Sequence, residues 1–389
     1  QRPKMAPSFM MKGARAGPGV ANVVLLGCGA VGRALARQII DKAGPRVRIM
    51  AMADSKGFVK AGGRDGLTAD QVRQALSTKE ASGSLSKAAG RASELVETLP
   101  PPGDERHHGV TIVADCTADD TAHVLLRAVE RGFRVASANK KPFADRPYGT
   151  FDRLTRWHGS CRFESTAGAC TPMVAAAMRL RSSLDHVSSF KGAMSGTLGF
   201  LLSTLQPQTG TSPPLSQALL AAIQGGYTEP DCRDDLSGVD VARKGVILAR
   251  VLGRTVEMAD VSIESLYPPA LKDVSYAEFE QRVCRDGELD EAMRIRVEAA
   301  KQAGEVLRYA AEMDGDTLKV GLVQVARASA LGQLEGTANL IEYHSEVFAP
   351  QPLVIQGCGA GSQATAAGVL ADIIELAHSA PPPWTSAGL

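Results

Sequence analysis

The sequence predicts an α/β protein, and three observations support that prediction. An apolar run at residues 21–26 leads directly into a glycine-rich turn and then into a helical segment that ends near residue 40. Similar apolar runs recur at residues 47–53, 110–116 and 133–138. Short apolar runs separated by helical segments are typical of a parallel sheet covered by helices. The chain has 389 residues, which is enough for two domains with separate cores.

Composition narrows the class of protein. Hydrophobic residues make up 44% of the chain and charged residues 22%, as in ordinary globular domains. The net charge of +1 argues against nucleic acid or an anionic membrane as the main partner, and no apolar run reaches membrane-spanning length. Seven scattered cysteines without a Cys-x-x-Cys pair argue against a disulfide framework and a metal cluster. A cytoplasmic location is therefore expected.

The N-terminal segment is basic. Residues 1–40 contain no Asp or Glu, whereas Arg2, Lys4, Lys12 and Arg15 lie within the first fifteen positions. One interpretation is a flexible tail over residues 1–18. The alternative is the remnant of a transit peptide, which is typically poor in acidic residues, and which would place the protein in an organelle such as the plastid stroma.

The glycine-rich turn matches the fingerprint of dinucleotide-binding folds. It reads Gly27-Cys-Gly-Ala-Val-Gly32 and lies between a predicted strand and a predicted helix, as the fingerprint requires. Gly27 would allow the tight turn, Gly29 the approach of a pyrophosphate, and Gly32 the close packing of helix on strand. The first residues of the helix, Ala30 and Val31, would present N–H groups to the phosphates. A Rossmann-type domain that binds NAD or NADP is predicted.

The end of the second predicted strand gives conflicting signals about the cofactor. Asp54 follows the run at residues 47–53, where an acidic residue binds the ribose hydroxyls of NAD. Lys56 follows two positions later and would instead suit the 2′-phosphate of NADP. Asp54 is also interpretable as a turn or helix-cap residue. The choice between NAD and NADP therefore stays open.

Polar residues follow the next two predicted strands. Thr117 comes after the run at 110–116, and Asn139 and Lys140 come after the run at 133–138. In doubly wound sheets, ligands bind beyond the carboxyl ends of the strands, so these residues are candidates for the site. Ordinary loop polarity is the alternative.

Residues 225–250 concentrate acidic side chains in front of a predicted helix. Five carboxylates lie within a dozen positions, at Glu229, Asp231, Asp234, Asp235 and Asp240. The helix is predicted to begin near Val239 with Ser237 as its N-cap, so Asp240 and Lys244 would share a face. They form either a surface ion pair or part of a polar pocket, in which carboxylates hold an ammonium group and the lysine moves a proton.

This stretch resembles the signature of the homoserine dehydrogenases in Tyr227-Thr-Glu-Pro-Asp231, Arg233-Asp-Asp-Leu-Ser-Gly238 and Asp240-Val-Ala-Arg-Lys244. One departure is Cys232, where the family usually has proline. The resemblance implies NAD(P)-dependent interconversion of L-homoserine and L-aspartate 4-semialdehyde, on the route to threonine and methionine. Lys244 is then the candidate proton donor. The candidate substrate-binding residues are Gly226, Glu229, Asp235 and Asp240.

Other segments also resemble the family. Ala138-Asn-Lys-Lys141 resembles the pattern whose first lysine lies at the nicotinamide and the substrate, which implies that role for Lys140. Ser195-Gly-Thr197 resembles a turn whose hydroxyls contact substrate oxygens or cap the next helix. Residues 162–172 resemble the segment that crosses between domains. There the resemblance implies a monovalent cation, such as sodium, on backbone carbonyls of Glu164, Ala167, Ala169 and Thr171, with a plain hinge as the alternative.

The C-terminal part contains a second glycine turn, Gly357-Cys-Gly-Ala-Gly361, before a predicted helix at 364–377. Family chains end by returning to the cofactor domain, which implies that Gly361 lies beside the nucleotide. The expected organisation is a cofactor domain at 19–150, completed by 351–378, with an inserted α+β substrate and dimerisation domain at 151–350 and a tail at 379–389. A long helix at 289–313 and strands at 318–326 and 338–347 are predicted inside the insert. A homodimer is expected.

Overall fold

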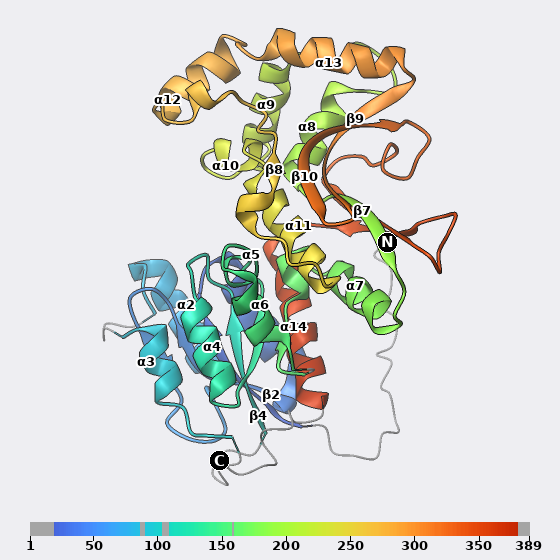
Figure 1. Ribbon diagram of the computed structural model, residues 1–389. Coiled ribbons are helices and arrows are strands. Elements are labelled where there is room, and N and C mark those ends of the chain that lie inside the picture. The colour runs from blue at the N-terminus through green and yellow to red at the C-terminus, as the bar shows by residue number, and fades with distance from the viewer. Residues whose placement is uncertain (1–18, 86–89, 103–108, 158, 380–389) are drawn as a thin grey trace, which may run out of the picture.

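The computed structural model describes residues 19–85, 90–102, 109–157 and 159–379 (Figure 1). The predicted tail at 1–18 and residues 380–389 of the predicted C-terminal tail lie outside these residues. The described chain contains two six-stranded sheets, ordered β3-β2-β1-β4-β5-β6 and β12-β11-β7-β9-β10-β8. The predicted α/β class is confirmed, and Figure 1 shows the two sheets in separate halves of the molecule.

The first sheet is parallel except for one edge strand. Its strands are β1 (Ala21–Leu26), β2 (Val47–Ala53), β3 (Phe58–Lys60), β4 (Val110–Asp115), β5 (Arg134–Ser137) and β6 (Cys161–Arg162), and only β3 runs antiparallel to its neighbour. Its helices are α1 (Ala30–Gln38), α2 (Ala69–Ser82), α3 (Ala92–Glu97), α4 (Ala122–Glu130), α5 (Lys141–Ala144), α6 (Tyr148–Thr155) and α14 (Ser362–His378).

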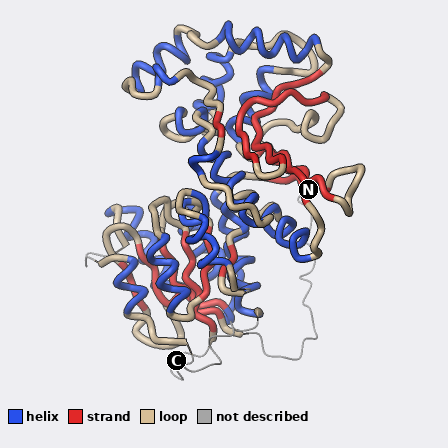
Figure 2. Tube along the Cα trace, in the orientation of Figure 1, coloured by secondary structure: helices blue, strands red, loops and turns tan. Residues whose placement is uncertain are grey.

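Both faces of this sheet are covered, as Figure 2 shows. All six residues of β1 are buried, and its apolar residues are divided between two clusters. Val23 and Leu25 pack with residues of α1, α2 and α14, whereas Val24 and Leu26 pack with residues of α3, α4 and α6. An apolar run without polar alternation is what a strand covered on two faces requires.

The second sheet is mainly antiparallel. Its strands are β7 (Val187–Ala193), β8 (Ser262–Ile263), β9 (Glu305–Asp314), β10 (Thr317–Ala326), β11 (Ala338–Ser345) and β12 (Leu353–Cys358). Its helices are α7 (Met173–Ser182), α8 (Gly196–Leu205), α9 (Leu215–Gln224), α10 (Arg233–Leu236), α11 (Val239–Val251), α12 (Tyr276–Phe279) and α13 (Asp290–Gln302). Helices α8, α11 and α13 pack against β9, and α11 also packs against α5 of the first half.

The predicted helix at 289–313 is wrong in its second half. Helix α13 ends at Gln302, and β9 begins at Glu305. Gly304 adopts a φ of 73° between them, a conformation that favours glycine and ends the helix. Residues 306–313 are mostly apolar, so their sequence does not distinguish a buried strand from a buried helix.

Sheet membership differs from the expected domain boundaries at both junctions. Strand β6 lies beyond residue 150 but pairs with β5 of the first sheet. Strand β12 lies beyond residue 351 but pairs with β11 of the second sheet, so α14 alone returns to the first half. Among the described residues, none of the helices has the length and apolar character needed to cross a bilayer.

Candidate active site

The first glycine turn separates two structural glycines from an open one. Gly27 has a φ of 86°, and its N–H donates to Ala53 O at 2.9 Å. A Cβ at Gly27 would collide with the backbone of Cys116, and a Cβ at Gly32 would collide with Gly27 O. A Cβ at Gly29 meets no atom within 4 Å. The space in front of Gly29 is therefore left for a ligand.

Helix α1 points its N-terminus at this space. The N-cap residue is Gly29, which has no side chain to cap the helix. Both Gly29 and Ala30 are exposed. The first N–H groups of the helix, at Ala30 and Val31, therefore face the open side of the turn. Unpaired N–H groups and the positive end of the helix dipole suit a pyrophosphate, so these residues fit the predicted dinucleotide.

Asp54 is held inside the loop after β2. Its Oδ1 accepts hydrogen bonds from the N–H groups of Lys56 at 2.8 Å and Gly57 at 2.9 Å. Its Oδ2 accepts from Lys79 Nζ at 2.9 Å and from Leu85 N at 2.8 Å. Burial alone would raise the pKa of Asp54, but these hydrogen bonds outweigh it and lower the pKa. Because a carboxylate has about four acceptor positions, this arrangement favours the turn role over the ribose contact.

The ends of β4 and β5 are joined by a buried hydrogen-bond network. Asp115 is fully buried and accepts hydrogen bonds from Thr117 Oγ1 at 2.7 Å and from Asn139 Nδ2 at 3.1 Å. Asn139 Oδ1 in turn accepts from Lys141 N at 3.1 Å. The network fixes the backbone on either side of Lys140, which is the N-cap residue of α5.

Lys140, Asp240 and Lys244 meet where the two halves of the molecule join. Asp240 Oδ1 lies 3.1 Å from Lys140 Nζ, and Asp240 Oδ2 lies 2.8 Å from Lys244 Nζ. Lys244 Nζ also donates to Met194 O at 2.6 Å. The Lys244 side chain is 10% exposed, whereas that of Asp240 is 44% exposed. Lys244 is thus a buried ammonium group, and the interpretation of its pair with Asp240 as a simple surface contact is wrong.

The charges of this cluster shift each other's pKa values. Burial lowers the pKa of Lys244, the neighbouring Lys140 lowers it further, and Asp240 opposes both. Burial alone would raise the pKa of Asp240, but the two ammonium groups outweigh it and the pKa falls well below its ordinary value. The half-exposed Asp240 thus remains ionised between two lysines.

Helix α11 begins as predicted at Val239, but its N-cap differs. The N-cap residue is Gly238, with a φ of 74°, and not Ser237. A Cβ at Gly238 would collide with Tyr309 Oη, so close packing against β9 selects glycine there. Ser237 Oγ instead accepts from Val239 N at 3.3 Å. Asp240 lies in the first turn of α11, as predicted.

Only some of the acidic side chains in the loop before α11 lie near Lys140, Asp240 and Lys244. Asp235 Oδ1 accepts from Thr197 Oγ1 at 2.8 Å, and Asp235 Oδ2 accepts from Glu229 N at 2.8 Å. Burial raises the pKa of Asp235, and the charges of Glu229 and Asp240 add to this effect. Asp231 forms a close ion pair with Arg233 at 2.6 Å. Asp235 thus lies near Asp240 and Lys244, whereas Asp231 serves the loop itself.

Several other candidates have structural roles. Gly226 is exposed, with a φ of 69°. Ser195 is the N-cap residue of α8, and its Oγ accepts from Leu198 N at 3.2 Å. Cys232 is fully buried, and its thiol lies close to the thiol of Cys284 and the hydroxyl of Tyr276, so the departure from proline is accommodated by packing.

Residues 162–172, which cross between the two halves, also contact the second glycine turn. Glu164 accepts from Val174 N and Ala175 N, both at 2.7 Å, and thereby caps α7. Ala169 O accepts from Ser165 Oγ at 2.8 Å, and Ala167 is buried. Thr171 Oγ1 donates to Cys358 O at 3.1 Å. Gly361 is the N-cap residue of α14, with a φ of 108°.

One functional group had no sequence signal. The carbonyl oxygen of Met194 holds Lys244 Nζ, but every residue carries a carbonyl, so residue type does not identify it. The Thr197–Asp235 contact was also missed as a pair, although both residues were singled out.

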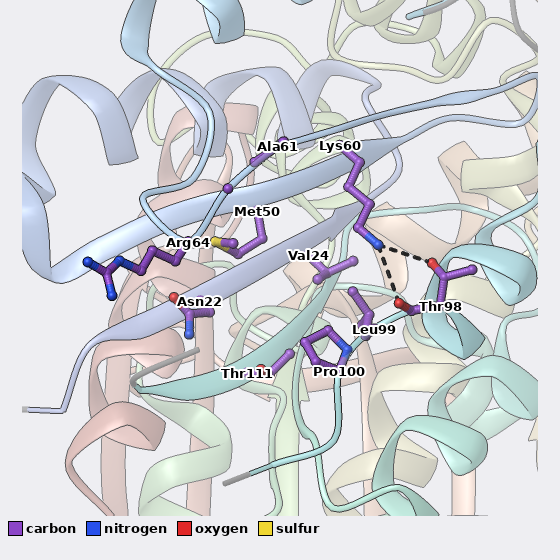
Figure 3. Close-up of a pocket in the computed structure, with 12 residues that line it drawn as sticks. Asn22, Val24, Met50, Lys60, Ala61, Arg64, Thr98, Leu99, Pro100 and Thr111 are labelled. Atoms are coloured by element: carbon purple, nitrogen blue, oxygen red, sulfur yellow. Dashed lines mark hydrogen bonds between the residues drawn. The ribbon is translucent and has the colours of Figure 1, made fainter. Parts of the chain in front are cut away.

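A cavity of about 590 Å³ lies elsewhere in the first half (Figure 3). Asn22 and Thr111 lie near the starts of β1 and β4, at the end of the sheet opposite the glycine turn. Lys60 Nζ points across it to Thr98 O at 3.3 Å. It is separate from the lysine cluster and is not part of the candidate active site.

The fold and the site define an NAD(P)-dependent oxidoreductase. The family model for the NAD-binding domain of homoserine dehydrogenase matches residues 27–155, and the homoserine dehydrogenase model matches residues 172–374. A homoserine dehydrogenase of Paracoccidioides brasiliensis is 36% identical over 280 residues, which cover 69% of this chain and 74% of that protein. The chain belongs to the homoserine dehydrogenase family, and its reaction is the NAD(P)-dependent oxidation or formation of a CH–OH group.

Solved structures share the architecture. A Candida auris protein of unknown function matches with a TM-score of 0.80 and 29% identity, over 92% of this chain and 98% of that one. A hyperthermophilic archaeal homoserine dehydrogenase in complex with NADPH matches with a TM-score of 0.67 and 21% identity, over 91% of this chain and 97% of that one. The second match supports the fold alone.

Proposed function

We propose that Lys244 transfers the proton when L-aspartate 4-semialdehyde and L-homoserine are interconverted. The bound nicotinamide would supply or accept the hydride at the substrate carbon. The substrate oxygen gains negative charge in the reduction and needs a proton. The observation that supports this proposal most strongly is the position of Lys244 Nζ. It is buried, it contacts Asp240 and Met194 O, and it lies beside Lys140. A lowered pKa brings an ammonium group closer to the pH range in which it can donate.

Lys140 assists in this proposal by stabilising charge on the substrate oxygen. It lies on the cofactor side of the site, at the end of β5, and its Nζ contacts the same carboxylate as Lys244. Thr117 lies beside it in the network of Asp115 and Asn139. Lys140 and Lys244 therefore face the same carboxylate from the two halves of the molecule.

The substrate's ammonium group is assigned to the carboxylates. Asp235 and Asp240 are near enough to influence each other's charge, and Glu229 lies at the exposed edge of the same loop. The activity assay is direct: purified protein, L-homoserine and either cofactor, followed by nicotinamide absorbance. No absorbance change with either NADP or NAD would contradict the proposed reaction.

We propose that NADP is the preferred cofactor. The carboxylate of Asp54 is occupied by four hydrogen bonds, which removes the acceptor that distinguishes NAD. Lys56 is exposed two positions after it and would supply a positive charge for a 2′-phosphate. Lys56→Ala should weaken NADPH binding and leave NADH binding unchanged. Equal effects on both cofactors would contradict this assignment.

The proposed sodium ion would bind carbonyl oxygens at Glu164, Ala167, Ala169 and Thr171. Ala169 O already accepts a hydrogen bond from Ser165, but a carbonyl oxygen has a second lone pair for a cation. Glu164 O accepts from Ala167 N at 3.2 Å and Thr171 O from Met173 N at 2.8 Å, and each likewise keeps a second lone pair. Activity in sodium chloride should exceed activity in choline chloride at equal ionic strength. Equal rates in the two salts would contradict the proposed sodium site.

The proposed homodimer would use the open edge of the second sheet. Strand β12 is an edge strand, and the exposed apolar side chains Val347, Phe348 and Val354 lie on it or on the loop before it. Unpaired strand edges with apolar side chains favour association. Light scattering should give twice the mass of one chain, and Val354→Lys should reduce it. A monomer mass at micromolar concentration would contradict the dimer.

We further propose a reducing compartment such as the cytoplasm, because all seven cysteines are free thiols.

A further inference from the structure

Arg250 is a fully buried guanidinium group near the end of α11. It is 0% exposed and makes four hydrogen bonds. Its Nε donates to Val256 O at 2.9 Å, one terminal nitrogen donates to Phe143 O at 2.8 Å and Arg146 O at 2.9 Å, and the other donates to Glu257 Oε2 at 2.6 Å. Burying a charge is costly unless it is fully hydrogen-bonded, so a set this complete indicates a specific task.

The carbonyls that Arg250 holds belong to the segment that carries Lys140. Helix α5 begins after Lys140, its N-cap residue, and Phe143 and Arg146 lie at its end and just beyond. Arg250, in contrast, is on α11, the helix that carries Asp240 and Lys244. The guanidinium group therefore connects the helix of one lysine to the helix of the other.

Two further ion pairs join the same helices. Arg243 Nε lies 2.8 Å from Asp145 Oδ1, at the end of α5, and Lys140 Nζ lies 3.1 Å from Asp240 Oδ1. Helix α11 thus contacts the α5 segment at its first turn, at its middle and at its last turn.

Glu257 completes the arrangement. One of its carboxylate oxygens accepts from Arg250, and the other accepts from Tyr148 N, the first residue of α6, at 2.8 Å. The Arg250–Glu257 pair therefore holds both the end of α5 and the start of α6. The charged and titratable groups that act on Arg250 are Glu257, Tyr148 and Asp145.

We propose that Arg250 is a positioning residue, which fixes Lys140 against Asp240 and Lys244 by clamping α5 to α11. The inference rests on the proposed proton transfer by Lys244. Guanidinium suits the task because its donors lie in a rigid fork that can hold several carbonyls at once, which an ammonium group cannot reproduce. Displacing a catalytic group by about 1 Å costs on the order of 10²-fold in rate, so the clamp matters to turnover.

The clamp also sets the electrostatics of Lys244. Three charged groups act on this lysine: Asp240, Lys140 and Asp235. The positive charge of Lys140 lowers the pKa of Lys244, so movement of Lys140 away from the cluster would raise it. Reduction of the aldehyde needs protonated Lys244. The alkaline limb of the reduction rate should therefore move to higher pH when the clamp is broken.

Arg308 provides a matched control. It is 5% exposed and also donates four hydrogen bonds to carbonyls, at Leu307, Leu331, Gly332 and Leu334. It lies on β9 and contacts neither α5 nor Lys140. Arg250→Met and Arg308→Met remove the same chemical group from two buried sites with four hydrogen bonds each. One partner of Arg250 is the Glu257 carboxylate, and only the change at Arg250 touches the clamp.

The test compares thermal stability, kcat, NADPH affinity and the pH profile of reduction in both variants. Both should lose stability. Only Arg250→Met should lose kcat, by about 10²-fold, and shift its alkaline limb upward, with NADPH affinity unchanged. Arg250→Lys should fail to restore kcat, because it keeps the charge but not the fork. A normal kcat and pH profile in Arg250→Met, or equal losses in Arg308→Met, would overturn the proposal.

A second variant applies if Arg250→Met does not fold. Arg243→Gln removes a partly exposed contact between the same helices, so the fold should tolerate it, and the alkaline limb should again move upward. An unmoved limb in a folded Arg243→Gln protein would overturn the clamp. Lys244→Ala is measured in parallel. Normal turnover in Lys244→Ala would contradict the proton donor itself, whereas slow Lys244→Ala with normal Arg250→Met would contradict only the clamp.

Discussion

At the scale of single residues, Gly29 and Gly32 lie three positions apart in one turn but respond oppositely to an added side chain. The structure leaves open space at Gly29 and none at Gly32. Gly29→Val should therefore keep the melting temperature near that of the wild type while abolishing NADPH binding. Gly32→Ala should cost about 1–3 kcal/mol of stability, as overpacking does. Fluorescence titration of NADPH and thermal unfolding of both variants check this. An unchanged dissociation constant in Gly29→Val would show that the turn does not bind the cofactor.

A second prediction at the scale of single residues concerns the effect of Asp240 on the pH dependence of reduction. Asp240 is the main anion that opposes the lowering of the pKa of Lys244 by burial and by Lys140, with a smaller contribution from Asp235. Asp240→Asn removes that charge with little change in shape, so the pKa of Lys244 should fall further. The alkaline limb of aldehyde reduction should then move to lower pH, opposite to the shift expected for Arg250→Met. The pH dependence of kcat measures the limb. No shift, or a shift upward, would mean that Asp240 does not set the charge state of Lys244.

At the scale of secondary structure, the strength of a local pattern determined what could be predicted. The strand–turn–helix of residues 21–38 was predicted because its glycines, apolar run and helix are all local signals. The helix predicted at 289–313 was wrong beyond Gln302, since the residues of β9 are buried almost without alternation and therefore show no strand period in the sequence.

The N-terminus of α11 was also mispredicted, because the residue that caps it is decided by a distant contact. Ser237 is a good N-cap residue by type, but Gly238 takes the position because Tyr309 on a distant strand leaves no room for a side chain. Such a contact joins residues far apart in the sequence and has no local signal. The carbonyl of Met194 at the active site was missed for the same kind of reason.

Ser195 tests the difference between a helix cap and a substrate contact. Its Oγ accepts from Leu198 N, which satisfies one of the free N–H groups of α8. Ser195→Ala should therefore cost about 1 kcal/mol of unfolding free energy and leave the KM for homoserine unchanged. Chemical denaturation and steady-state kinetics measure the two effects. A several-fold rise in KM with unaltered stability would assign the hydroxyl to the substrate instead.

At the scale of the whole molecule, the proposed active site lies where two halves meet, and its two lysines were chosen from family resemblance more than from residue patterns. No local pattern shows that α11 faces α5, or that Lys140 and Lys244 share one carboxylate. The cofactor half could be predicted from its residues because its motif lies within one strand–turn–helix unit. The substrate half depends on contacts between segments a hundred residues apart.

The whole molecule should also turn over without a divalent metal. Over the part of the chain that the structure describes, no group of three or more His, Cys, Asp or Glu side chains could hold a metal ion. In the proposed mechanism, a protonated lysine and the cofactor would supply the charge stabilisation that a metal otherwise provides. Treatment with a strong chelator should leave the rate unchanged. A loss of activity that zinc restores would contradict this expectation, whereas a dependence on sodium would not.

The most direct test of the account is kcat for aldehyde reduction by Lys244→Arg. Arginine keeps the positive charge beside Asp240 but does not give up a proton in the accessible pH range. If Lys244 transfers the proton, kcat should fall by about 10²–10⁴-fold, with NADPH affinity unchanged, because the glycine turn lies elsewhere. If the arginine variant keeps a near-normal kcat, Lys244 contributes charge alone, and the proton must come from another group, with Lys140 as the first candidate.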